Sequence, residues 1–152
     1  MHGPVKIYET FGTDASQPSG LDLSSGDTWG VAGEYDYILM DCPPVLGVLM
    51  VNALAASDRI IVPVQTEFLA LKGLERMIKT MEIMQGEQQN LFRFTIVPTM
   101  FDKRTKASLL AYRKLQELYQ GDVWSGVIPI DTNFRNVSQI QRTPSDYSPS
   151  TR

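Results

Sequence analysis

One stretch constrains this chain more than any other: an apolar run that ends on a single carboxylate and is stopped at once by two prolines. The apolar residues are Ile38–Met40, the carboxylate is Asp41, and the prolines are Pro43 and Pro44. Such a run predicts a strand buried on both faces, as in a parallel sheet, and proline cannot continue a hydrogen-bonded ladder. Asp41 is therefore expected at the carboxyl end of a strand, which is the edge where open α/β sheets bind ligands.

A lone carboxylate at that edge can hold Mg²⁺ through water beside a nucleotide phosphate. The same stretch also fits a second interpretation, in which Asp41 simply ends a strand and binds nothing. The stretch alone does not decide between the two.

Strand-like and helix-like segments alternate after residue 33. Strands are predicted at Tyr37–Asp41, Ile60–Val64, Phe94–Pro98 and Val123–Ile128, and helices at Leu46–Ala56, Leu69–Met84 and Lys106–Tyr119. In the second helix, apolar residues recur at helical spacing, which predicts one buried face: Leu71, Leu74, Met77, Ile78, Met81 and Met84. One further short helix is expected after residue 131. This order predicts right-handed βαβ units and an α/β fold with a mainly parallel sheet.

Composition separates an N-terminal segment from the rest. Residues 1–33 are rich in Gly, Ser, Asp and Thr, which predicts a poorly structured or atypical segment with room for one short strand at Val5–Tyr8. Residues 34–152 are expected to form the folded part. The 43% hydrophobic and 20% charged content is ordinary for a soluble globular protein.

Several functional classes are disfavoured by composition. No apolar run reaches the roughly 20 residues that cross a membrane, so no membrane association is expected. Cys42 is the single cysteine and His2 the single histidine. One cysteine excludes an internal disulfide and suits a reducing cytoplasm, and the pair is too few for a zinc site.

Seven motifs occur in a fixed order along residues 34–149: Asp41–Gly47, Asn52–Arg59, Val62–Gln65, Ala70–Leu74, Pro98–Thr105, Val127–Pro129 and Phe134–Ser138. In this order they closely resemble the ParA/MinD group of deviant-Walker P-loop ATPases, nearest to the ParA-type partitioning proteins. A collinear set of motifs is far more specific than any one of them.

The resemblance implies a three-layer P-loop NTPase-like α/β fold and an ATP-dependent switch that segregates chromosomes or plasmids. Asp41 would be the catalytic carboxylate and would hold the hydrated Mg²⁺. Thr99, Met100 and Pro129 would flank the adenine of ATP, although ordinary strand-to-helix loops would look the same in sequence. The family's proteins dimerise, bind DNA without sequence preference and work with a ParB-type partner, which implies a cytoplasmic, nucleoid-associated protein.

One departure from the family is large. No G-x-x-x-x-G-K-[ST] match, the glycine loop whose lysine and backbone N–H groups cradle phosphates, occurs in the sequence. The chain is therefore expected to be the C-terminal part of such an ATPase, incomplete at the N-terminus, with impaired ATP binding and hydrolysis. The sheet should then show a gap between Tyr37–Asp41 and Ile60–Val64, a pairing of those two strands, or a replacement strand from Val5–Tyr8.

Two alternatives remain open. The first is a non-enzymatic pseudo-ATPase module that binds DNA or a full-length ParA-type protein. The second is a MinD-like cell-division regulator, which is disfavoured because the sequence ends without the amphipathic helix that membrane cycling needs.

A basic cluster lies within residues 103–114, on a chain whose net charge is −3. Its members are Lys103, Arg104, Lys106, Arg113 and Lys114. Such a cluster is the electrostatic footprint of binding to a phosphate backbone, and the alternative is a solvated helix face. The resemblance favours DNA, because Arg104 and Arg135 match basic positions that ParA-type proteins use on DNA. The predicted DNA contacts are Lys103, Arg104, Lys106 and Arg135.

Overall fold

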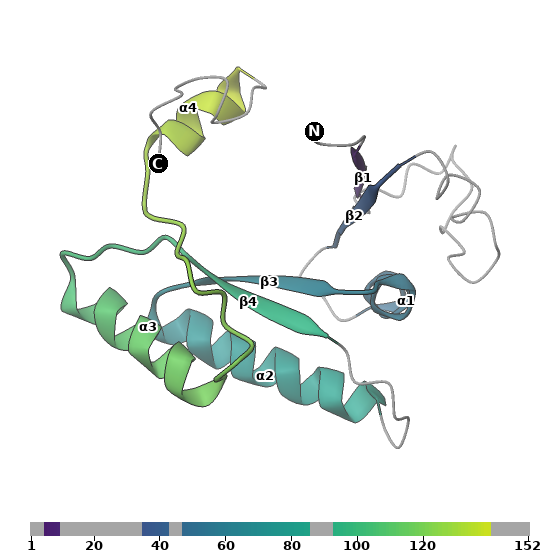
Figure 1. Ribbon diagram of the computed structural model, residues 1–152, viewed down its shortest axis with the longest axis horizontal. Helices are drawn as coiled ribbons and strands as arrows, with labels where there is room; N and C mark the ends of the chain where they lie inside the picture. Colours follow the sequence, from purple (N-terminus) through teal and green to yellow (C-terminus); the bar gives the residue numbers. More distant parts are fainter. Residues whose placement is uncertain (1–4, 10–34, 43–46, 86–92, 141–152) are drawn as a thin grey trace. The chain divides into compact units, whose positions relative to one another are not determined.

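The computed structural model describes residues 5–9, 35–42, 47–85 and 93–140 (Figure 1). The chain divides into two compact units, Met1–Ile60 and Ile61–Arg152, and each is described by itself. The first contains β1 (Val5–Glu9), β2 (Tyr37–Asp41) and α1 (Val48–Ala56). The second, with β3 starting at the boundary, contains β3 (Ile60–Gln65), α2 (Phe68–Gln85), β4 (Phe94–Thr99), α3 (Lys106–Leu118) and α4 (Asn133–Gln139).

In the first unit, β1 lies beside β2 and runs parallel to it. The register places Val5 opposite Tyr37 and Glu9 opposite Asp41. The strand predicted from Val5–Tyr8 in the N-terminal segment is therefore observed, paired with β2. Asp41 is the last residue of β2, as predicted from the prolines that follow it.

The predicted burial of β2 on both faces is wrong. Tyr37 is 65% exposed and Leu39 is 46% exposed, and Ile38 and Met40 are only half-buried. The apolar run correctly indicated a strand. However, side chains of a strand stand on both faces, and pairing with β1 along one edge covers neither face.

In the second unit, β3, α2 and β4 form a βαβ unit. Figure 1 shows β3 and β4 running in the same direction, with α2 and α3 on the same side of the pair. Alternate residues of both strands are buried, as expected when one face of a sheet is covered. The apolar core residues of this unit are Val62, Val64, Leu71, Leu74, Ile78, Met81, Ile96, Ala111, Leu115 and Val137. The helical periodicity predicted for α2 is thus confirmed at Leu71, Leu74, Ile78 and Met81.

The predicted strand Val123–Ile128 is wrong, because a single isolated bridge joins this segment to β4. Ile96 bridges to Val123, but the ladder does not continue to residue 98. Pro98 has no N–H to donate, and its carbonyl accepts from Ile128 N at 2.8 Å rather than from Gly126, the next residue in a regular ladder. One proline in β4 therefore interrupts the neighbouring strand.

The other elements lie within one or two residues of their predicted bounds, and the α/β class with parallel strands is confirmed. The boundary predicted between residues 33 and 34 lies outside the described residues and stays a prediction. No helix in the described ranges is both long and apolar enough to cross a membrane.

The core of the second unit predicts a large cost for truncating Leu115, which is fully buried on α3. Leu115→Ala should lower the free energy of unfolding by about 2–5 kcal/mol, because it removes buried methyl groups and leaves a cavity. Leu118→Ala is the matched control, since Leu118 lies on the same helix and is 59% exposed. Urea denaturation should show a change within about 0.5 kcal/mol for the control, and equal losses in both variants would contradict this core.

Candidate functional site

The candidate site lies at the carboxyl ends of β3 and β4. Thr66, the residue after β3, donates its backbone N–H to the carbonyl of Thr99, the last residue of β4, at 3.1 Å. Met100 follows with a φ of 52°, a left-handed conformation that is uncommon outside glycine. This turn ends β4 and directs the chain toward α3.

A second segment runs alongside this turn. Phe101 donates its N–H to the carbonyl of Ile128 and accepts from the N–H of Ile130, both at 3.1 Å. These bonds place Pro129 opposite Phe101 and close to Met100, which is 48% exposed. The residues predicted to flank an adenine, Thr99, Met100 and Pro129, are therefore brought together, while their contact with a base stays a prediction.

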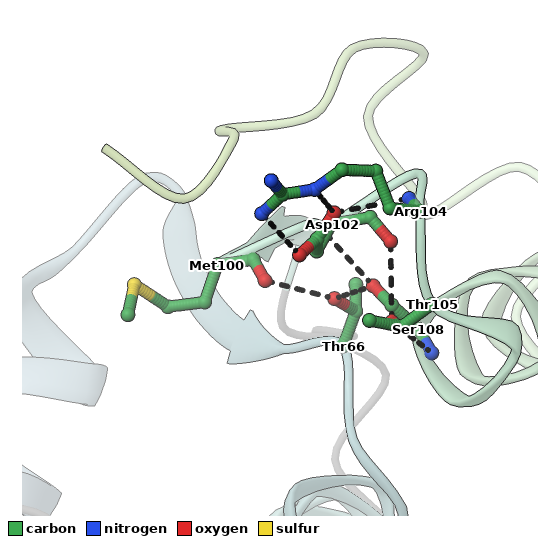
Figure 2. A network of polar contacts seen from close by, with 6 residues as sticks. All are labelled: Thr66, Met100, Asp102, Arg104, Thr105 and Ser108. Carbon is green, nitrogen blue, oxygen red and sulfur yellow. Dashed lines mark hydrogen bonds and ion pairs between the residues drawn. The ribbon is translucent and has the colours of Figure 1, made fainter. Parts of the chain in front are cut away.

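A buried pair of hydroxyl groups joins β3 to α3. The Thr66 and Ser108 side-chain oxygens lie 2.6 Å apart, and each residue is 5% exposed (Figure 2). The Thr66 hydroxyl also lies 3.4 Å from the carbonyl oxygens of Thr99 and Met100, and Asp102 donates its backbone N–H to the Ser108 hydroxyl at 3.1 Å.

The donors and acceptors of this network determine in which direction each hydroxyl donates. The amide of Asp102 can only donate and the carbonyls can only accept, so Ser108 donates to Thr66, and the single hydrogen of the Thr66 hydroxyl is directed at the carbonyls of Thr99 and Met100. When hydrogen bonds are connected in series in this way, each one polarises the next. Burial strengthens the bond between Thr66 and Ser108 further, because the surroundings are less polar than water.

The first turn of α3 is held by its own capping bonds. Thr105 is the N-cap, and its hydroxyl accepts from the N–H of Ser108 at 3.3 Å. The carbonyl of Asp102 accepts from the Thr105 backbone N–H at 3.1 Å and from its hydroxyl at 3.2 Å. The loop between β4 and α3 is thus fixed at Asp102, Thr105 and Ser108 (Figure 2).

Asp102 and Arg104 form a two-pronged ion pair on this fixed loop. Arg104 donates from Nε to Oδ1 at 2.9 Å and from one terminal nitrogen to Oδ2 at 2.8 Å, and its backbone N–H also donates to Oδ1 at 3.0 Å. The Arg104 side chain is 79% exposed, whereas that of Asp102 is 19% exposed.

These bonds change the acidity of both groups. Hydrogen bonds from the Arg104 side chain, then from its backbone N–H, lower the pKa of Asp102 to about 2, and the carboxylate raises the pKa of Arg104. A lowered folded-state pKa stabilises the fold above the ordinary value of 3.8, and this contribution is lost as pH falls toward 2. The pair therefore stays charged at neutral pH.

The structure places the predicted DNA contacts only in part. Lys103, Arg104 and Lys106 are exposed and lie within four residues of each other at the start of α3, and Arg113 and Lys114 are exposed farther along it. Arg135 lies on α4, and its side chain is outside what the structure describes. Its place among the DNA contacts stays a prediction.

Asp41 belongs to the first unit, where it is exposed at the end of β2. Mg²⁺ is commonly held by one or two carboxylates together with phosphate oxygens and water, so this donor fits a metal that arrives with a nucleotide. In the described ranges no three His, Cys, Asp or Glu side chains come together as a ready-made metal site.

The sequence-based prediction missed Thr66, Asp102 and Ser108. A local signal existed for part of the network, because Thr105 and Ser108 have the spacing of an N-cap and the residue whose N–H it accepts. No local signal marks Thr66, which is 42 residues away from Ser108.

The hydroxyl pair predicts a specific sensitivity to Thr66→Val, which keeps the shape of the side chain but removes its hydroxyl. Stability should fall by about 1–3 kcal/mol, because the Ser108 hydroxyl loses a buried partner. Thr80→Val is the matched control, since Thr80 donates to the Arg76 carbonyl on the exposed surface of α2. Chemical denaturation should separate the two variants, and an equal response would argue against a structural role for the buried pair.

Comparison with known proteins places this geometry in a family. Residues 28–94 match the sequence family described as AAA domain. Sporulation initiation inhibitor protein Soj of Bacillus subtilis is 37% identical over 120 residues, which cover 78% of this chain and 45% of Soj. Chromosome partitioning protein ParA of Myxococcus xanthus is also 37% identical over 120 residues, covering 78% of this chain and 40% of that protein.

A solved structure is similar to this chain in both sequence and fold. Cobyrinic acid a,c-diamide synthase from Mycobacterium smegmatis, with bound ADP and magnesium, is 32% identical with a TM-score of 0.58. The match covers 67% of this chain and 42% of that one, and the chain likewise spans less than half of the two relatives above. Together with the parallel α/β fold, these similarities show that the chain belongs to the ParA-type family of P-loop ATPases.

Proposed function

We propose that the chain acts in DNA segregation as a ParA-like partitioning protein and contacts DNA phosphates without reading their sequence. The observation that carries this proposal is the exposed basic cluster on α3 and on the loop before it, a loop that hydrogen bonds at Asp102 and Thr105 hold in place. Lys103, Arg104 and Lys106 stand on this loop and the first residue of α3. The similarity to proteins named ParA and Soj supports a role in partitioning.

Electrostatics favours DNA as the ligand of this cluster. Residues 103–114 include five basic residues and no aspartate or glutamate, although the net charge of the chain is −3. A local field of one sign decides contacts with a polyanion even when the whole protein is acidic. Contacts to phosphates fix position but carry no sequence information, which suits binding along any duplex.

Nucleotide would act at the carboxyl ends of the strands. Thr99, Met100 and Pro129 would supply an apolar wall with backbone hydrogen-bonding groups for the adenine, and Asp41 would hold hydrated Mg²⁺. In a complete enzyme of this kind, ATP would bridge two subunits and its hydrolysis would release them, whereas in this chain alone ATP binding and hydrolysis would be impaired. A ParB-type protein, a second copy or a full-length ParA-type protein is the proposed partner, on the nucleoid in the cytoplasm.

A second candidate is favoured by the missing phosphate-binding motif. Without the glycine loop and its lysine, the chain would act as a pseudo-ATPase that binds DNA or a ParA-type protein and hydrolyses nothing. DNA binding is common to both candidates, and residual nucleotide turnover by this chain would favour the first.

The proposed DNA contacts predict a specific salt dependence. The double variant Arg104→Ala/Arg135→Ala should weaken binding equally on unrelated duplexes and reduce the log–log salt slope by about 0.9 for each lost contact. Arg76→Ala/Lys79→Ala removes the same charge from exposed positions of α2 and serves as the control. Gel shifts from low to moderate salt measure both slopes, and identical slopes would identify the basic cluster as an ordinary solvated surface.

The missing motif predicts weak Mg·ATP binding and no steady turnover. Most of the recognition energy for a nucleotide comes from its charged phosphates, and the base-binding segments alone supply little of it. Isothermal titration and phosphate release should show no difference between wild type, Asp41→Ala and the control Asp58→Ala. Submicromolar binding or steady turnover that is lost only in Asp41→Ala would contradict this prediction. It would show that residues of this chain bind the phosphates without the glycine loop motif.

A further inference from the structure

The ion pair between Asp102 and Arg104 leaves part of the guanidinium available. Asp102 takes the Nε–H and one N–H of Nη2. The N–H groups of Nη1 and the second N–H of Nη2 are not used by this carboxylate. Figure 2 shows the remaining nitrogen on the side away from Asp102, and the side chain as a whole is 79% exposed.

Asp102 is the fixed member of the pair. Its N–H is bonded to Ser108, its carbonyl to Thr105, and its Oδ1 to the backbone N–H of Arg104. Through Ser108 and Thr66 the same network reaches the end of β3. The main chain of Asp102 is thus held by Ser108 and Thr105, and its carboxylate is held by the backbone N–H of Arg104. The Arg104 guanidinium is at the end of a long, exposed side chain.

We propose that Asp102 is a positioning residue that fixes the Arg104 guanidinium so that its remaining N–H groups face a DNA phosphate. This inference rests on the proposed function, in which Arg104 touches DNA. An arginine loses considerable rotamer freedom when it binds, and one that is already held loses less of it on contact. The exposed pair contributes little to folding, which leaves its geometry to serve binding.

Charge alone would have the opposite effect. Asp102 cancels the charge of Arg104 and repels a phosphate, so a purely electrostatic role predicts that removing the carboxylate strengthens DNA binding. Positioning predicts that removing it weakens binding. The two explanations therefore differ in sign.

Asp102→Asn tests this difference with little disturbance to the loop. Asparagine keeps one oxygen, which can still accept from the Arg104 backbone N–H and from Nε. Its NH₂ group cannot accept from Nη2, so the second guanidinium bond and the charge that holds the side chain are lost. DNA affinity at low salt should fall about threefold to tenfold, the range expected when one long side chain must be ordered on binding. Glu117→Gln is the control, because it removes the same charge from an exposed position of α3 and should not weaken binding.

Two further measurements keep the outcomes distinct. Relaxation of the Arg104 ¹⁵Nε signal without DNA should show a rigid side chain in wild type and a mobile one in Asp102→Asn. Arg104→Ala should weaken binding, and adding Asp102→Asn to it should weaken binding no further.

Tighter binding by Asp102→Asn, or a guanidinium that is mobile in wild type, would overturn the positioning role while leaving the DNA contact intact. Wild-type binding that Arg104→Ala leaves unchanged would instead remove Arg104 from the DNA contacts. A wild-type chain that shifts no duplex at low salt would overturn the proposed function itself, and this inference with it.

Discussion

The 2.6 Å contact between the Thr66 and Ser108 hydroxyl groups is the interaction on which the site depends. It joins the end of a strand to the first turns of a helix within the core of the second unit. Ser108 then holds the backbone of Asp102, and Asp102 holds Arg104. A surface arginine is thus connected to the sheet through fixed groups, although its own side chain is exposed.

Most of the fold could be predicted because its signals are local. The apolar spacing in α2 identified four buried positions, and the prolines after Asp41 identified the end of β2. The failures are interactions between distant parts of the chain. Pro98 interrupts a neighbouring strand more than 20 residues away, from Val123 onward, and no pattern within that strand reveals it.

The candidate site divides in the same way. The basic residues near the start of α3 were identified from charge alone, and their exposure agrees with that expectation. The ion pair that occupies Arg104 was not predicted, because Asp102 looked like the residue that merely precedes the cluster. A charge pattern in the sequence shows only how many basic residues lie together. Recognition of a phosphate also depends on which N–H donors remain available and how firmly they are held.

The left-handed backbone of Met100 limits what this position can become. At a φ of 52° a side chain costs roughly 1–2 kcal/mol, and a branch at Cβ makes the conformation worse. Glycine and asparagine suit it best, while valine, isoleucine and threonine are disfavoured whatever ligand lies nearby. Sequence drift at this position is therefore governed by the backbone, and any contact with a base must come from an unbranched side chain or from the main chain.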